Sequence, residues 1–95
     1  MNAKEWRKFW RECGMGELRA LLAASWPPLA GASTVAREAC AFRIASLLGS
    51  RARREAIADE LARIRRDELG LEAEPAEDDR AAGRIAAWFA EAARP

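Results

Sequence analysis

Arginine is the residue type in this chain whose pattern most directly suggests a chemistry. Seven arginines and three acidic residues lie between Arg43 and Arg66, which gives this segment a local charge of +4. Arg51, Arg53 and Arg54 would stand at the start of a helix, as in the recognition helix of a helix-turn-helix protein that binds DNA. One hypothesis is therefore a nucleic-acid-binding module that uses the arginine-rich helix 51–66.

The same segment also fits a surface helix that is stabilised by ion pairs. Charged residues recur every four positions along one stripe, which comprises Arg51, Glu55, Asp59, Arg63 and Asp67. Opposite charges at this spacing stabilise a helix by about 0.2–0.5 kcal/mol per pair. The whole chain has 16 basic and 15 acidic residues, whereas nucleic-acid-binding domains usually carry a basic footprint. We favour the ion-pair interpretation and keep nucleic-acid binding as the alternative.

An acidic segment follows the arginine-rich one. Its acidic residues are Glu72, Glu74, Glu77, Asp78 and Asp79. Such a run around Pro75 is typical of a solvated linker, and this is the interpretation that we prefer. The segment could instead bind a basic partner, or fold back on the arginine-rich helix and screen its charge.

Aromatic residues form a stripe near the start of the chain. Trp6, Phe9 and Trp10 have the i, i+3, i+4 spacing of one helical face. We expect this stripe to dock on Trp88 and Phe89 and to belong to the core, because large aliphatic side chains are few. If the stripe stays exposed, Trp6 and Trp10 become anchors for a partner, or are buried in a homodimer.

Little in the sequence supports catalysis. The chain has no histidine, the commonest acid–base side chain. Carboxylates such as Glu38, Asp59 and Glu60 have no partner at motif spacing, and no phosphate-binding loop is present. We expect a protein that is not an enzyme and that uses no cofactor and no metal.

The cysteine pattern indicates the cellular compartment in which the protein resides. Cys13 and Cys40 form no Cys-x-x-Cys pair, and both fall on apolar helix positions. We expect two buried, reduced thiols and a cytoplasmic location. No apolar run reaches about 18 residues, so we expect no membrane span.

Helices must position all of these side chains. Alanine supplies 23 of the 95 residues, while the residues that favour strands are scarce. The apolar periodicity predicts an all-α fold, a compact bundle of four to five helices at about 3–13, 17–25, 34–48, 51–69 and 77–93. The chain would form one domain, 1–95, with the acidic linker at about 72–79 before the last helix.

Glycines and a serine or threonine set several of the expected boundaries. Gly14 and Gly16 predict a turn after the first helix. Ser33 or Thr34 is expected to cap the third helix, which Gly49 ends. Gly70 predicts that the helix ends at a glycine in the left-handed conformation. Leu71 would then pack back against that helix. The predicted core comprises Leu18, Leu21, Leu22, Trp26, Phe42, Ile44, Leu47, Leu48, Ile57, Leu61, Ile64 and Trp88.

Residues 18–71 resemble a family of small uncharacterised bacterial helical proteins. The matching positions are the turn Trp26-Pro27-Pro28-Leu29-Ala30-Gly31, the helix end at Ile44, Leu47 and Leu48, and the stop at Leu69-Gly70-Leu71. Pro27 stands where the family usually has Asp in its Trp-Asp-Pro-Ile-Gly turn. The resemblance implies a helical fold and a role as an immunity or accessory protein.

The sequence thus predicts a non-enzymatic protein-binding module that acts through charged helix faces. Charges of both signs would guide the encounter with a protein partner and set its specificity. The candidate partner-binding residues are Arg51, Arg53, Arg54, Arg65, Arg66, Glu72, Glu74, Glu77, Asp78, Asp79, Trp6 and Trp10.

Overall fold

The helical fold class predicted from the composition is confirmed. A computed structural model describes residues 2–94 and contains helices but no strand in that range. The elements are α1 (Ala3–Phe9), a π-helical turn (Trp10–Gly14), α2 (Met15–Ser25), a 3₁₀ turn (Pro27–Gly31), α3 (Thr34–Gly49), α4 (Arg54–Arg63), a second π-helical turn (Ile64–Glu68) and α5 (Pro75–Ala92). No helix among these is long and apolar enough to cross a membrane.

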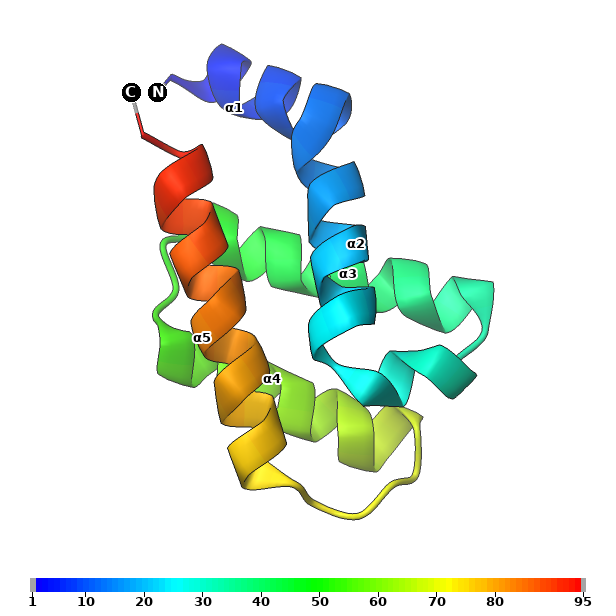
Figure 1. Cartoon of the computed structure of the whole chain (residues 1–95). Helices are drawn as coiled ribbons and strands as arrows, with labels where there is room; N and C mark the ends of the chain where they lie inside the picture. The colour runs from blue at the N-terminus through cyan, green and yellow to red at the C-terminus, as the bar shows by residue number, and fades with distance from the viewer. Residues whose placement is uncertain (1, 95) are drawn as a thin grey trace.

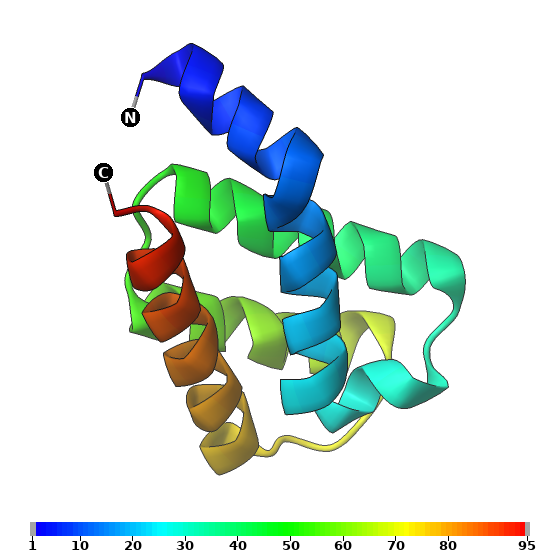
Figure 2. The ribbon, with the colours of Figure 1, turned by 45° about the horizontal axis from the view of Figure 1, so that its top comes forward.

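The helices form two layers that cross each other. In Figure 1, α2 and α5 lie side by side in front and run in opposite directions, while α3 and α4 pass behind them. Figure 2 shows the same arrangement from another side, with α1 extending from the top of α2. The start of α1 and the end of α5 meet at one end of the molecule. The first and last helices are therefore neighbours in space.

The predicted turn after the first helix is wrong. Gly14 has φ −58° and ψ −47°, so the chain stays helical from α1 through the π-helical turn into α2. The direction of the helix changes there, as it commonly does at a π-helical turn. A Cβ at Gly14 would lie 2.6 Å from Cε2 of Phe9 and 2.7 Å from Cε3 of Trp10. Glycine is needed because two aromatic rings approach the backbone.

The caps of α3 were predicted in part. Ser33 is the N-cap, and its Oγ accepts a hydrogen bond of 3.1 Å from the Ala36 N–H. At the other end Gly49 remains helical, and the left-handed residue is Arg51, with φ 60°. The next helix therefore begins at Arg54, and both Arg51 and Arg53 precede it.

The stop after the arginine-rich helix has the expected glycine. Gly70 has φ 63°, and the Leu71 N–H donates a 2.9 Å hydrogen bond to the Arg65 carbonyl. Leu71 does not pack back as predicted, since 46% of its surface is exposed. The last helix begins at Pro75, so only residues 69–74 connect the two helices.

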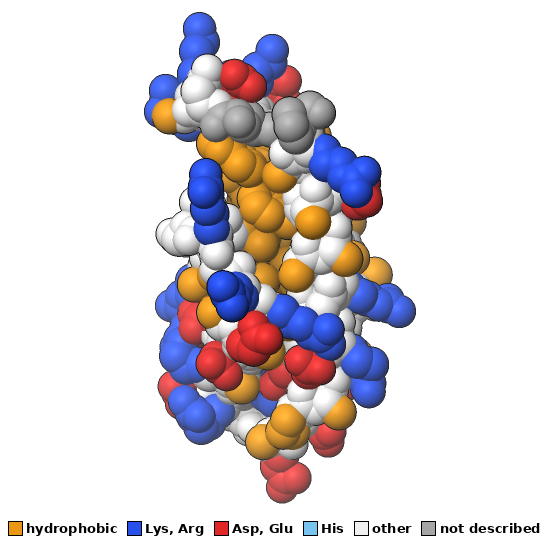
Figure 3. Space-filling model, turned by 90° about the vertical axis from the view of Figure 1, so that its left-hand side faces the viewer, with side chains coloured by type: hydrophobic (Ala, Val, Ile, Leu, Met, Phe, Trp, Pro, Cys, Tyr) orange, Lys and Arg blue, Asp and Glu red, His pale blue; other side chains and the backbone are white. Residues whose placement is uncertain are grey.

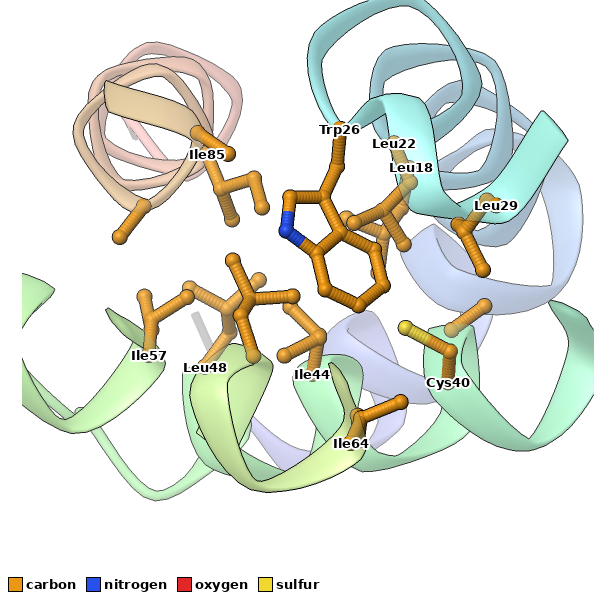
Figure 4. Close-up of a cluster of buried hydrophobic side chains, with 14 residues drawn as sticks. Leu18, Leu22, Trp26, Leu29, Cys40, Ile44, Leu48, Ile57, Ile64 and Ile85 are labelled. Atoms are coloured by element: carbon orange, nitrogen blue, oxygen red, sulfur yellow. The ribbon is translucent and has the colours of Figure 1, made fainter. Parts of the chain in front are cut away.

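Trp26 lies at the centre of the core. Figure 4 shows its indole between the layers, with Leu18 and Leu22 of α2, Ile44 of α3 and Ile85 of α5 around it. The predicted core residues that are buried are Leu18, Leu22, Trp26, Ile44, Leu48, Ile57, Leu61 and Ile64, while Leu21, Leu47 and Trp88 are half-buried.

One predicted core residue, Phe42, and one predicted buried thiol, Cys13, are exposed. Phe42 is 66% exposed, because the broad apolar side of α3 is wider than the face that its neighbours cover. Cys13 is exposed, since it lies on the π-helical turn outside the packed layers. Cys40 is buried as expected, and burial raises the pKa of its thiol to about 12. Its thiol is therefore protonated at neutral pH.

Candidate functional site

A buried ion pair joins the arginine-rich and acidic segments. Arg65 donates from Nη2 to Oδ1 of Asp78 at 2.7 Å and from Nε to the same oxygen at 3.1 Å. Its Nη2 also donates to Oε1 of Glu77 at 2.6 Å. Trp26 donates from Nε1 to the same Oδ1 of Asp78 at 2.8 Å. The Arg65 guanidinium lies 5.6 Å from the centre of the Trp26 ring, within the range of a cation–π interaction.

This ion pair corrects the prediction for Arg65 and Asp78. Their side chains are only 5% and 3% exposed, so neither belongs to a surface that a partner could contact. The acidic segment is no solvated linker from Pro75 onward: it forms the first turns of α5 and folds back on the arginine-rich helix. A charge at a buried position costs free energy unless a partner compensates it, and here the two segments compensate each other.

Most of the other arginines between Arg43 and Arg66 also have carboxylate partners. The remaining pairs are Arg54 with Asp79, Arg63 with Glu60 and Glu68, Arg66 with Asp67, and Arg43 with Glu68. Arg54 binds Asp79 through two hydrogen bonds, of 3.2 and 2.8 Å, and a Cβ at Gly83 would lie 2.9 Å from its Cζ. The basic charge that nucleic-acid binding would use is therefore largely neutralised within the molecule.

The ion pairs of this helix differ from the predicted stripe. Arg63 pairs with Glu60 and Glu68 rather than with Asp59 or Asp67. Glu60 lies one turn before Arg63 within α4 at the i,i+3 spacing, and the π-helical turn at Ile64–Glu68 changes the side-chain register after Arg63, which brings Glu68 rather than Asp67 to it. Arg51 also leaves the stripe, since its left-handed conformation places it outside α4.

Seven of the predicted partner-binding residues are exposed, and four of these seven form no ion pair within residues 2–94. These four are Arg51 and Arg53 before α4, and Glu72 and Glu74 before α5. Their charges lie in two separate connections, and none of them lines the hollow beside Trp6 and Trp10 or the one between α2 and α3. They do not form a site by themselves.

The aromatic stripe docks on the last helix, as expected. The Phe89 ring stacks on Trp6 and on Trp10, with ring centres 5.3 and 5.8 Å apart and planes within about 21°. Phe9 and Trp88 complete this aromatic cluster through tilted and edge contacts. The Trp88 Nε1 donates a 3.2 Å hydrogen bond to Oε1 of Glu17, which also joins α5 to α2.

The cluster is only half-buried. Trp6, Phe9 and Trp10 are all of intermediate exposure, and α1 contributes no fully buried residue to the core. A hollow of about 580 Å³ opens beside the two tryptophans. We call it the aromatic hollow; it is lined by Ala3, Trp6, Arg7, Trp10, Arg11, Met15 and Gly49. Figure 3 shows apolar side chains gathered in a depression beneath the α1 end, with basic side chains around it.

Basic residues predominate at this end of the molecule. Residues 3–14 contain four basic and two acidic side chains, a net charge of +2. The basic ones, Lys4, Arg7, Lys8 and Arg11, are exposed and have no ion-pair partner in the described part of the chain. Arg7 and Arg11 line the aromatic hollow itself. The hollow thus combines indole surface with two guanidinium groups that are free to bind an anion.

A second hollow, of about 530 Å³, lies between α2 and α3 and differs in its charges. Arg19 and Glu38, both at its lining, form an ion pair of 3.2 Å. Arg37 donates hydrogen bonds to the carbonyls of Leu29 and Ala30. Because these charged groups already have partners, this hollow is the weaker candidate for a binding site.

The sequence pattern identified part of this site and missed the rest. The pattern made Trp6 and Trp10 candidate anchors for the case that the stripe stays exposed, and it gave Arg7 and Arg11 no role. Each arginine directly follows a tryptophan in the sequence, so it sits at the border of the aromatic face. That adjacency was the available signal.

Comparisons with known proteins add no family to these observations. No protein-family model matches the chain, no curated protein matches it, and no solved structure matches it. Within residues 2–94, no group of three or more Cys, Asp or Glu side chains could hold a metal ion. The function therefore has to be argued from the geometry of the aromatic hollow.

Proposed function

We propose that this chain is a non-enzymatic protein-binding module that contacts its partner through the aromatic hollow. One observation carries the proposal: two half-buried tryptophans and two arginines without ion-pair partners line the same hollow. Tryptophan and arginine are enriched among the residues that dominate binding energy at protein interfaces. The helical layers below act as a rigid support that holds these side chains in place.

The predicted charged faces take a smaller part in this proposal. Arg65 and Asp78 stabilise the fold, and Arg54 and Asp79 neutralise each other. We place the module in the cytoplasm, because both cysteines are free thiols and disulfides are rare in a reducing compartment.

A crosslinking experiment tests whether the aromatic hollow is the contact surface. The photoreactive amino acid p-benzoylphenylalanine replaces Ala3, an exposed residue at the rim of the hollow. In the matched control it replaces Val35, which is 79% exposed on α3 and does not line the hollow. We expect a discrete protein crosslink from position 3 in cells that make the protein, and none at that mass from position 35.

Two outcomes would contradict the proposal. Equal crosslinks from both positions would mean that contact is not specific to the aromatic hollow. A crosslinked product that nuclease digestion removes would favour the nucleic-acid alternative.

A further inference from the structure

We infer that the aromatic hollow accepts an acidic amphipathic helix of a partner protein. This inference rests on the proposed function, and it adds the chemistry of the partner. The bound helix would insert a large apolar side chain beside Trp6 and Trp10. Two carboxylates one turn apart on that helix would then pair with Arg7 and Arg11.

Charge complementarity is the first argument for an acidic partner. Arg7 and Arg11 are four residues apart on the same helical segment, so their side chains emerge about one turn from each other. Neither has an ion-pair partner among residues 2–94. Lys4 and Lys8 lie on the same segment and also have no ion-pair partner in that range. A carboxylate pair at i, i+4 on a partner helix has the matching spacing.

The wall of the hollow is the argument for an apolar anchor on the partner. Both indoles stack on Phe89, so one side of each ring is already in contact within the cluster. Their remaining surface lines a hollow of about 580 Å³ together with Met15 and Ala3. A leucine or aromatic side chain that fills this hollow would remove apolar surface from water, at roughly 25 cal/mol for each Å².

The all-helical fold favours a helical over an extended partner segment. One common way for an extended peptide to bind is to add a strand to the edge of a sheet. The described residues form no sheet, so an extended peptide would find no such edge. A helix satisfies its own backbone hydrogen bonds, so it contacts its partner through side chains. A hollow that is lined by side chains can accept a partner of this kind.

Other occupants fit the hollow less well. A second copy of this chain related by a twofold axis would bring the arginines of both hollows together. A flat bilayer would need rings that protrude, whereas Trp6 and Trp10 are half-buried and stack on Phe89. Single-stranded nucleic acid stacks its bases on open aromatic faces, and here Phe89 covers one face of each indole.

Fluorescence anisotropy with synthetic peptides tests the inference on the full chain. The probe is a labelled 18-residue helix with a leucine stripe flanked by glutamates at i, i+4. One comparison peptide has lysine at every glutamate position, and another has alanine at every leucine position. We expect the acidic leucine peptide to bind at least tenfold more tightly than either comparison peptide.

Charge reversal in the protein locates the binding site. The double variant Arg7→Glu/Arg11→Glu should weaken binding of the acidic peptide at least tenfold. The matched control, Arg80→Glu/Arg84→Glu, reverses two exposed arginines on α5 that do not line the aromatic hollow, and should change binding less than twofold. Unchanged far-UV circular dichroism would show that both variants remain folded.

Several results would overturn this inference, each of them distinguishable from failure of the proposed function. Equal binding of the acidic and lysine peptides, or equal loss in both double variants, would overturn it. So would tighter binding of a labelled oligonucleotide or of anionic lipid vesicles, or a crosslink from position 3 to a second copy of the chain. The proposed function itself fails only if position 3 gives no specific protein crosslink.

Discussion

Asp78 connects three parts of the molecule that lie far apart in the sequence. Its Oδ1 accepts hydrogen bonds from Trp26 at the end of α2 and from Arg65 after α4, while Asp78 itself belongs to the start of α5. The other carboxylate oxygen, Oδ2, is buried and has no hydrogen-bond partner within residues 2–94. The residue therefore stabilises the fold only while its charge and its partners are kept together.

Replacing Asp78 should reveal this dependence. Asp78→Asn keeps the shape of the side chain but leaves the buried Arg65 guanidinium with Glu77 as its remaining carboxylate partner. We expect the free energy of unfolding, measured by urea titration, to fall by about 3 kcal/mol. Asp79→Asn, which removes an exposed ion pair at the next position, should cost less than about 1 kcal/mol.

A double replacement tests whether Asp78→Asn loses stability because it leaves the buried charge of Arg65 without its partner. Arg65→Met/Asp78→Leu removes both buried charges and leaves only the neutral Trp26 Nε1–H without its acceptor, so it should be more stable than Asp78→Asn alone. A double variant that is less stable than Asp78→Asn would contradict this explanation.

At the scale of the elements, the first π-helical turn decides where the aromatic stripe points. The turn at Trp10–Gly14 redirects the helix so that Trp6 and Trp10 reach Phe89 at the end of α5. Gly14 permits the turn to carry two rings close to its backbone. This glycine is required by packing, and not by a left-handed conformation.

Two glycine substitutions in this region should have opposite effects. Alanine at Gly14 would clash with Phe9 and Trp10. Overpacking of this kind lowers the free energy of unfolding by about 1–3 kcal/mol, which exceeds the gain from the higher helix propensity of alanine. Alanine at Gly16 meets nothing within 4 Å in α2 and should stabilise the protein by about 0.5–1 kcal/mol. Thermal unfolding measures both, and near-UV circular dichroism should change only for Gly14→Ala. Equal shifts in the two variants would argue against the packing explanation.

For the whole molecule, charge is balanced by ion pairs both between helices, as for Arg54 with Asp79, and within one helical segment, as for Arg63 with Glu60 and Arg66 with Asp67. Hydrogen bonds from Arg63 hold the pKa of Glu60 below its usual range, and those from Arg66 do the same for Asp67. A carboxylate whose pKa is lower in the folded state binds fewer protons there than in the unfolded state. Its contribution to stability is present above its ordinary pKa and is lost as the pH falls through the folded value.

Acid should therefore destabilise the protein in a defined range. We expect the urea midpoint to be steady between pH 7 and 5 and to fall below the ordinary glutamate pKa of about 4.3. Glu60→Gln should lower the midpoint at pH 7 and make it less dependent on pH between 5 and 3. A wild-type midpoint that is the same at pH 7 and pH 3 would show that these pairs do not contribute.

Local sequence patterns were enough to predict the fold class and most of the buried positions. Alanine, leucine and arginine favour helices, and the spacing of Leu18, Leu22, Ile57 and Leu61 marks the faces that are buried. This information is local, because a helical face is defined by residues three and four positions apart. The same local pattern identified Trp6 and Trp10 as a pair on one face.

The packing of the helices against one another set which of the other side chains are available to a partner. Arg65 and Asp78 looked like surface charges in the sequence, and the docking of α5 on α4 buried them together. Arg7 and Arg11 looked like an ordinary polar face, and the packing of their segment beside Met15 of α2 and Gly49 of α3 placed them at the aromatic hollow. Such outcomes depend on how helices far apart in the chain pack against each other, and residue periodicity within one helix does not encode that packing.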